Sequence, residues 1–223
     1  MPSTPAPRRN RTREALLAAG AALLAERPID ALAVDDIVNA AGVAKGSFYN
    51  HFADKAALAV AIGDAVRADI ETRVDAANAN VADPALRLVR GICVYVDFAL
   101  ADAARARIMA RGLRAAAATP GDSATDLHAG LRADIALGLS AGRFALPTSD
   151  VGTLFVAGVG EAALAAVLAP TTTPQFAILL AQQLCALVLK AFGLPQDEAE
   201  RIAAQAAHDV ISAQAAHDVI TLD

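Results

Sequence analysis

Apolar residues recur along most of this chain at intervals of three and four, the spacing that places them on one face of an α-helix. The apolar-polar alternation typical of a strand is not sustained in any segment, and prolines, glycines and short polar runs separate the helical periods. The pattern predicts an all-α fold of about nine to ten helices. The segments expected to be helical are residues 10–27, 34–41, 45–51, 54–79, 84–101, 103–117, 122–142, 149–168 and 173–193.

Two of these segments are short and lie close together near the N-terminus. Apolar positions in 34–41 follow i, i+3, i+4, i+7, and Gly42 closes that helix. In 45–51 the side chains of Phe48 and Phe52 pack inward, which leaves a polar, cationic and partly aromatic face outside. Two short helices joined by a glycine turn form a helix-turn-helix, whose second helix fits a DNA major groove about 12 Å wide.

Charge is distributed unevenly between the two parts of the chain. The formal net charge is −5, which argues against a general nucleic-acid binder. Residues 1–60, however, carry seven Lys and Arg against six Asp and Glu, whereas residues 61–223 carry twelve against eighteen. Arg8, Arg9, Arg11 and Arg13 form a basic cluster around the start of the first helix and are placed to meet phosphates, although a solvated tail would have the same composition.

Composition indicates where the core comes from. Hydrophobic residues make up 56% of the chain and aromatic residues 4%, so burial depends on aliphatic helix faces. Cys93 and Cys185 lie far apart in apolar surroundings and fit no ligand spacing or disulfide framework, so both are interpreted as small buried side chains. No apolar segment follows the N-terminal arginines, so no secretory signal is expected. A cytoplasmic location follows from these features.

The longest apolar run, Val151 to Ala169, is long enough to be tested as a membrane span. Glu161 interrupts it, as do the small residues Gly152, Gly158, Gly160 and Ala162. These features favour a helix buried at a subunit interface. No membrane association is therefore expected.

The segment from Val34 to Leu58, VDDIVNAAGVAKGSFYNHFADKAAL, resembles the signature of the TetR/AcrR (tetracycline-repressor-like) family of transcriptional regulators. The resemblance covers residues 10–70 and includes the Gly42 turn, the Lys45–Tyr49 stretch and Lys55. It implies a three-helix DNA-binding domain followed by a larger helical bundle for ligand binding and dimerisation. The expected divisions are a disordered basic arm at 1–9, the helix-turn-helix domain at 10–53, a connecting helix at 54–79, the ligand-binding and dimerisation domain at 80–203, and a repeated tail at 204–223.

The resemblance also implies roles for individual residues of the helix-turn-helix. In proteins of this kind, Tyr49, His51 and Lys55 would contact phosphates, and the second short helix would present its exposed positions to base edges. Gly46 would allow close approach to the duplex, or would serve only to start the helix. The expected DNA-binding residues are Ala44, Lys45, Gly46, Ser47, Tyr49, Asn50, His51, Lys55 and Arg11.

This chain departs from the family pattern just before the second helix. The family commonly has Thr or Ser there as a helix cap and phosphate contact, whereas this chain has Leu32 and Ala33. Asp30 lies too early to cap, so Asp35 and Asp36 are expected to stabilise the helix start by charge alone.

The resemblance further implies a ligand pocket in the helical body and a four-helix bundle between two subunits. The alternative for the last helices is that they complete the core of a monomer instead of pairing with a second subunit. The expected ligand-binding residues are Tyr95, Phe98, Met109, Arg111, Arg114, His128 and Phe155. The expected interface residues are Leu154, Gly158, Ala162, Ala165, Leu180, Leu184, Leu187 and Val188.

Enzymatic activity is not expected. The stretch from Gly158 to Ala163 matches a dinucleotide-binding fingerprint only formally, because no strand precedes it. The four histidines form no constellation with a nucleophile, and no metal site or cofactor is expected. Two of these histidines lie in "AQAAHDVI", which occurs at 204–211 and again at 213–220. This repeat is interpreted as a duplicated, partly frayed tail, and no function is assigned to it.

Together these observations predict a homodimeric, ligand-responsive transcriptional regulator. Its partners would be double-stranded DNA containing a palindromic operator and a small-molecule inducer that releases a repressor. A helix-turn-helix protein that shapes or activates DNA without ligand control is the second hypothesis, and a ligand-induced change in DNA affinity would separate the two.

Overall fold

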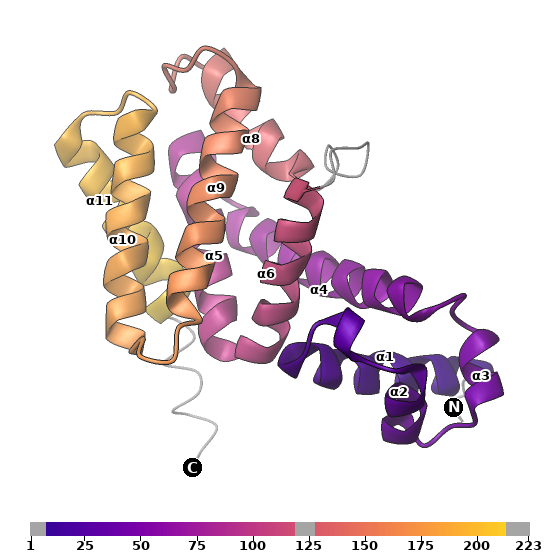
Figure 1. Cartoon of the computed structure of the whole chain (residues 1–223). Helices are drawn as coiled ribbons and strands as arrows, with labels where there is room; N and C mark the ends of the chain where they lie inside the picture. The colour runs from indigo at the N-terminus through magenta and orange to yellow at the C-terminus, as the bar shows by residue number, and fades with distance from the viewer. Residues whose placement is uncertain (1–7, 119–127, 213–223) are drawn as a thin grey trace, which may run out of the picture.

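The computed structural model describes residues 8–118 and 128–212, and ten α-helices with no strand make up this part of the chain. Figure 1 shows two groups of helices, a small head formed by α1 to α3 and a larger body that contains α5 and the helices after it. Helix α4 extends from the head into the body. The prediction of an all-α fold, with an N-terminal helix-turn-helix ahead of a larger bundle, is confirmed.

The head has a core of its own. It contains α1 (Arg8–Glu26), the 3₁₀ turn η1 (Ile29–Ala31), α2 (Val34–Ala41) and α3 (Lys45–Tyr49). Gly42 ends α2 with a φ of 66°, the left-handed conformation that glycine adopts without a steric penalty. Leu16, Ile37 and Phe48 are fully buried together, so one side chain from each helix fixes the three helices against one another.

The start of α2 differs from the sequence expectation. Ala33 stands at the N-cap and has no capping side chain, but Asp36 reaches back and accepts a hydrogen bond of 3.0 Å from the Ala33 backbone N–H. A carboxylate at the third helical position can satisfy this otherwise unpaired donor. The expectation that Asp35 and Asp36 act by charge alone is therefore wrong for Asp36.

Helix α4 (Lys55–Asn78) takes part in two hydrophobic cores. Asp54 caps its start by accepting a 2.7 Å hydrogen bond from the Ala57 backbone N–H. Leu58 and Ile62 belong to the core of the head, whereas Val66 and Ile70 belong to the core of the body. One continuous helix is therefore anchored in both cores.

The body packs around α5 (Pro84–Ala101), which contacts every other long helix of this part. Cys93 on α5 and Cys185 on α10 are both fully buried, as expected, and their sulfur atoms lie 3.9 Å apart. The hydrogen bond with Cys93, together with burial, raises the pKa of the Cys185 thiol. The remaining helices are α6 (Ala103–Ala118), α8 (Ala129–Ser140), α9 (Ser149–Val167), α10 (Pro174–Ala191) and α11 (Gln196–Ala207), which continues into a π-helical turn at His208–Ser212.

Two sequence expectations change in the body. The helix expected at 122–142 is α8, which occupies Ala129–Ser140 within the described residues, and positions 122–127 lie outside them. Residues 204–211 were expected to be a frayed tail, but α11 and the turn after it bury Ala206, Ala207 and Ile211 in the core. The first copy of the repeat therefore packs as part of the body, and the second copy at 213–220 lies outside the described residues.

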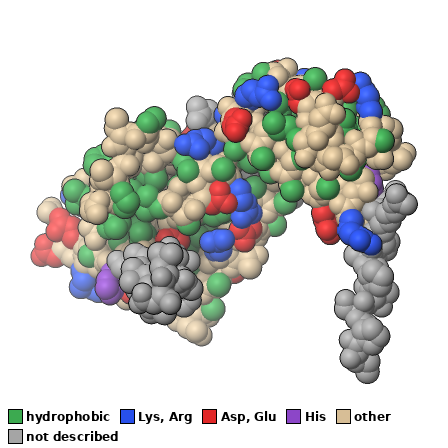
Figure 2. Space-filling model, turned by 90° about the horizontal axis from the view of Figure 1, so that it is seen from below, with side chains coloured by type: hydrophobic (Ala, Val, Ile, Leu, Met, Phe, Trp, Pro, Cys, Tyr) green, Lys and Arg blue, Asp and Glu red, His purple; other side chains and the backbone are tan. Residues whose placement is uncertain are grey.

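Helices α9 and α10 are the most apolar of the described helices, and both are long enough to cross a membrane by length and composition. Each has one face in the core of the body and another exposed face. Figure 2 shows hydrophobic side chains gathered over the body, whereas basic and acidic side chains are mixed over the head. Core helices of soluble proteins pass the same length test, so the test is weak evidence for a membrane span.

Candidate nucleic-acid interface and ligand cavity

Two phenylalanines anchor α3 and thereby orient its outer face. Phe48 is fully buried and Phe52 is 5% exposed, and their ring centroids lie 5.9 Å apart. The edge of Phe48 also meets the Tyr49 ring at 5.3 Å, so the neighbouring tyrosine is held in place while 54% of it stays exposed. On α1, the Arg13 guanidinium lies 5.5 Å from the Phe52 ring and adds a cation–π contact to this anchor.

The structure brings the residues expected to contact DNA to one end of the head. Ala44, Lys45, Gly46, Tyr49, Asn50 and Arg11 are exposed, whereas Ser47, His51 and Lys55 are half-buried. Arg11 on α1 borders a shallow depression together with Val43, the residue two positions before α3 begins. Helix α1 begins at Arg8, within the arm expected at 1–9, so Arg11 belongs to α1 and shares one surface with the segment that leads into α3.

Gly46 has open space in front of its Cα. A Cβ added there would meet no atom within 4 Å, so packing within the head does not require glycine at this position. Both explanations of Gly46, close approach of the duplex and adaptability at the helix start, remain predictions.

Lys45 is paired across the turn with a residue of α2. Its Nζ lies 2.8 Å from Oδ1 of Asp35, and the two side chains are 56% and 60% exposed. The hydrogen bond from Lys45 to Asp35, followed by the charge of the carboxylate, raises the pKa of Lys45. An exposed pair of this kind is weak, so the ammonium can exchange Asp35 for a base edge or a phosphate.

Lys55 makes contacts within the head that the sequence did not suggest. Its Nζ donates hydrogen bonds to the backbone oxygens of Leu32 at 2.9 Å and Asp30 at 3.2 Å. These bonds tie the start of α4 to the segment that leads into α2. Two of the three N–H donors of the Lys55 ammonium are therefore used in the free protein, and one is left for a phosphate.

Helix α6 reaches the head from the body. Ile108 is buried in the core of the head, and Arg111 donates hydrogen bonds to the backbone oxygens of Leu24 and, at 3.2 Å, Arg27. These oxygens lie at the C-terminal end of α1, where backbone acceptors have no helical partner and a cation is favourable. Arg111 was expected to line a ligand pocket, but the structure places it between the body and the head.

A cavity of about 560 Å³ lies in the body between α4, α5, α8 and α9. Its volume is within the range typical of small-molecule sites, and most of its wall is aliphatic. Tyr95 and His128, two of the residues expected to bind ligand, line it. Burial raises the pKa of Tyr95 and lowers that of His128, so both side chains are uncharged near neutral pH.

The other residues expected to bind ligand lie elsewhere. Phe98 is 1% exposed, and the guanidinium groups of Arg73 and Arg105 each lie 5.4 Å from the centre of its ring. Met109 is buried in the core of the body, and Phe155 is 43% exposed on α9. The side chain of Arg114 lies outside the described part of the structure.

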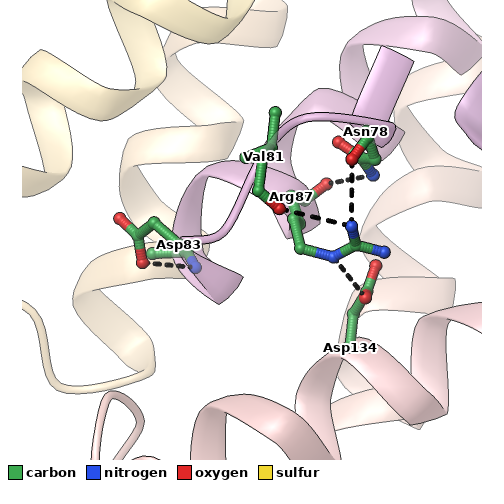
Figure 3. Close-up of polar contacts among 6 residues, drawn as sticks. Asn78, Val81, Asp83, Arg87 and Asp134 are labelled. Carbon is green, nitrogen blue, oxygen red and sulfur yellow. Dashed lines mark hydrogen bonds and ion pairs between the residues drawn. The ribbon is translucent and has the colours of Figure 1, made fainter. Parts of the chain in front are cut away.

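The charged residues of the cavity wall were not predicted from the sequence. Arg87 on α5 donates a 2.7 Å hydrogen bond from Nε to Asp134 on α8, and a 3.1 Å bond from Nη1 to the backbone oxygen of Asn78 (Figure 3). The buried Asn78 amide donates in return to the Arg87 backbone oxygen at 3.1 Å. Arg87 and Asp134 also line the cavity, so this network joins the cavity wall to the C-terminal end of α4.

The residues expected at a dimer interface are exposed on α9 and only partly exposed on α10. Leu154, Gly158, Ala162 and Ala165 are all exposed on α9, and on α10 Leu187 is 57% exposed while Leu180 and Leu184 are half-buried. Val188 is fully buried in the core of its own subunit, so its assignment to the interface is wrong. The face also contains large exposed residues that were not predicted, namely Val151, Phe155, Phe176 and Leu179.

The formal dinucleotide fingerprint has no structural support. Gly158 and Gly160 lie in the interior of α9, whereas a phosphate-binding glycine turn connects a strand to a helix. Among the residues that the structure describes, no group of three His, Cys, Asp or Glu side chains is arranged to hold a metal ion.

Comparisons with known proteins agree with this architecture. The model of the family described as bacterial regulatory proteins, tetR family, matches residues 16–62, which span α1 to the first half of α4. A search of curated proteins finds no significant match.

Many solved structures share the fold. RolR (NCGL1110) in complex with resorcinol is 26% identical, with a TM-score of 0.60 over 87% of this chain and 94% of that one. A regulator from Shewanella sp. PV-4, of the tetR family by its description, has a TM-score of 0.71 at 17% identity, over 82% of this chain and 99% of that one. The ketosteroid transcriptional regulator KstR2 of Mycobacterium tuberculosis has a TM-score of 0.61 at 23% identity, over 82% of this chain and 95% of that one.

Proposed function

This chain belongs to the tetR family of bacterial regulatory proteins, and on that premise we propose that it is a homodimeric repressor of a palindromic operator, released by a small molecule. As a member of this family it is a transcriptional regulator with a DNA-binding helix-turn-helix. The proposal adds the direction of regulation, the symmetry of the operator, the dimer, action in the cytoplasm and the release by ligand.

The observation that carries the proposal is the placement of α3. Its buried side is fixed by Phe48, and its outer side presents Lys45, Tyr49 and Asn50 together with Arg11 of α1. Lysine donates to guanine, asparagine pairs with adenine, and tyrosine and arginine contact phosphates, so one surface combines base reading with backbone contacts.

The exposed apolar faces of α9 and α10 support the dimer. Leu154 is 77% exposed, and Phe176 and Leu187 are each more than half exposed, which is an unusual concentration of apolar surface for a monomer. Pairing with the same two helices of a second copy would cover this surface in a four-helix bundle. A twofold dimer would present two α3 helices to successive major grooves about 34 Å apart, which requires a palindromic site.

The cavity beside α4 supports control by a ligand. The relative RolR was solved with resorcinol bound, and it aligns with most of this chain. In the proposed mechanism, an occupant of the cavity shifts the intact Arg87–Asp134 pair and, through Asn78, the C-terminal end of α4. Each tenfold loss of DNA affinity requires that the ligand prefer the non-binding state by about 1.4 kcal/mol.

A regulator that shapes DNA without a ligand would share the helix-turn-helix. It would not need the cavity or the hydrogen-bond network of Arg87, Asp134 and Asn78 on its wall. A formed cavity of about 560 Å³ joined to the connecting helix therefore favours ligand control over that alternative. No enzymatic role is proposed, because no constellation of nucleophile and base was found among the described residues that line the cavity.

The proposal is tested by selecting bound sequences from a random duplex pool with the purified protein and measuring the enriched pool at several salt concentrations. Enrichment of a palindrome, with affinity falling steeply as salt rises, is the expected result for a dimer that contacts several phosphates on each half-site. A folded dimer that enriches no sequence at low salt would contradict the proposal.

The dimer is tested separately by sedimentation of Leu187→Lys, which places a charge in the proposed interface. Val60→Lys is the matched control, because Val60 is a similarly exposed apolar residue on α4, at 63% against 57%. The account expects Leu187→Lys to shift the protein toward monomer and Val60→Lys to leave the dimer intact. Equal sedimentation of both variants and the parent as dimers would place the interface elsewhere.

A further inference from the structure

The wall of the cavity between α4, α5, α8 and α9 has a charge balance that restricts what it can bind. Most of the wall is aliphatic, with side chains such as Val74, Ile92 and Leu164. A ligand must therefore bury an apolar body, and its affinity will come mainly from that burial. The charged residues of the wall are Glu71, Asp75, Asp134, Asp150 and Glu161 against Arg87 and Arg132.

Both arginines of the wall are already neutralised by partners. Arg87 is paired with Asp134 at 2.7 Å, and these two side chains are only 27% and 15% exposed. Arg132 is paired with Asp150 through Nη1, and its buried Nε has no hydrogen-bond partner within the described part of the structure. An anionic ligand that took Arg87 from Asp134 would leave an acidic side chain without its cation, which is costly because this pair is partly buried.

The acidic side chains on α4 are in a different position. Glu71 and Asp75 lie one turn apart, line the cavity and remain open to solvent, which places them at its mouth. Within the described part of the chain, neither has a hydrogen bond or ion pair among the contacts that the structure gives. His128 adds no positive charge near neutral pH, because burial lowers its pKa.

A polar group deeper in the cavity is free to orient an uncharged part of the ligand. Tyr95 projects into the cavity from α5, and its hydroxyl makes no hydrogen bond among the contacts of the described residues. Because burial raises its pKa, the hydroxyl stays protonated and can both donate and accept.

We infer that this cavity binds an apolar ligand bearing a protonated amine or quaternary ammonium group, with the apolar body inside and the cation at the mouth beside Glu71 and Asp75. The inference rests on the proposed function, because it assigns the chemistry of the inducer that the repressor would recognise. Carboxylate ligands are disfavoured by the same residues.

Three probes of nearly the same shape test this inference: 4-phenylbutylamine, 4-phenylbutan-1-ol and 4-phenylbutanoate. Calorimetry on the full-length protein without DNA measures the affinity of each. The expected order is amine, then alcohol, then carboxylate, with the amine about fivefold tighter than the alcohol because two exposed carboxylates contribute modestly. This preference should shrink as salt rises.

A pair of variants with equal charge change identifies the residues responsible. Glu71→Gln with Asp75→Asn should remove most of the amine's advantage and leave alcohol binding within about twofold. Asp197→Asn with Glu200→Gln changes the net charge equally on α11, away from the cavity wall, and should leave the amine's advantage intact.

Three results would overturn the inference: a carboxylate that binds as tightly as the amine, an amine advantage that survives Glu71→Gln with Asp75→Asn, or no binding by any probe. A protein that selects an operator but shows one of these results would keep the proposed function and lose only the inference. A protein that prefers the amine but selects no DNA sequence would keep the assigned ligand chemistry of the cavity and lose the proposed function.

Discussion

Lys45 of α3 is held by Asp35 of α2, with 2.8 Å between the ammonium nitrogen and the carboxylate oxygen across the turn of the helix-turn-helix. The two residues lie ten positions apart, and the contact spans the surface that would face DNA. The lysine proposed to read a base is thus paired with an acidic side chain in the free protein.

Asp35→Asn is expected to raise DNA affinity a few-fold, because Lys45 no longer leaves an ion pair to bind. Fluorescence anisotropy with a selected duplex, measured at several salt concentrations, checks this. Asp30→Asn removes the same charge from the head without touching Lys45 and controls for net charge. If Asp35→Asn gave the same gain in a Lys45→Ala background, the ion pair would not be the cause.

Lys55→Met is expected to lower the free energy of unfolding by about 1–2 kcal/mol, since hydrogen bonds from a charged donor to Leu32 and Asp30 are lost in a partly buried site. Urea denaturation at fixed protein concentration measures the loss. Lys45→Met is the matched control and should cost less than 1 kcal/mol, because its partner is exposed. Equal losses would show that the backbone contacts of Lys55 do not stabilise the head.

Gly138→Ala is expected to destabilise the body by about 2–3 kcal/mol. A Cβ at this position of α8 would lie 2.1 Å from the ring of Phe144, and that ring is itself packed edge-on against Phe192. Gly63→Ala on α4 is the control, because a Cβ there meets nothing within 4 Å and helix propensity favours alanine by up to about 1 kcal/mol. Thermal unfolding that moved both variants in the same direction would contradict this account of α8.

The stability of the body should depend on the ionisation of Asp83. Hydrogen bonds from Arg143, at 3.0 and 3.1 Å, lower the pKa of Asp83, and a bond from the Ala85 backbone N–H adds to this effect. A carboxyl with a lowered pKa in the folded state stabilises the fold above its unfolded value of about 3.9. That contribution is lost as pH falls through the lower folded value.

Asp83→Asn should therefore lose less free energy of unfolding than the parent between pH 6 and pH 3, although it starts from a lower stability at pH 6. Asparagine can still cap α5, so the helix start is kept. Asp75→Asn, at an exposed position of α4, should follow the parent more closely. A pH profile of Asp83→Asn parallel to that of the parent would show that this pair does not contribute to acid sensitivity.

The sequence predicted the helices whose ends are fixed locally. Residues 34–41 and 84–101 form helices with the expected bounds, because Gly42 ends the first and Asp83-Pro84 starts the second. The inward positions of Phe48 and Phe52 followed from their four-residue spacing. These features depend on neighbours in the chain, and neighbours are visible in a sequence.

Features that depend on packing between distant segments were not predicted. Three contacts join residues that lie 23 to 92 positions apart in the chain. They are the contact of Lys55 with Leu32, that of Arg111 with the end of α1, and that of Cys93 with Cys185. The cavity wall was missed for the same reason, since Arg87 and Asp134 meet only when α5 packs on α8.

Helix α11 could have been found. Its first turn contains Asp197 and Glu198 after Pro195, and Ala199, Ile202 and Ala206 continue at helical spacing. The repeat that begins at residue 204 masks this periodicity, because its small alanine side chains make the buried face inconspicuous.

The central claim, that α3 binds DNA through its exposed face, is tested most directly by the affinity of Tyr49→Ala for a selected operator and for an unrelated duplex. Tyr49 is 54% exposed, so its removal should leave the fold intact, as circular dichroism can verify. The account predicts that affinity for both duplexes falls about tenfold, because a phosphate contact serves every sequence. Unchanged binding to both duplexes by the folded variant would contradict the assignment of α3 as the DNA-binding helix.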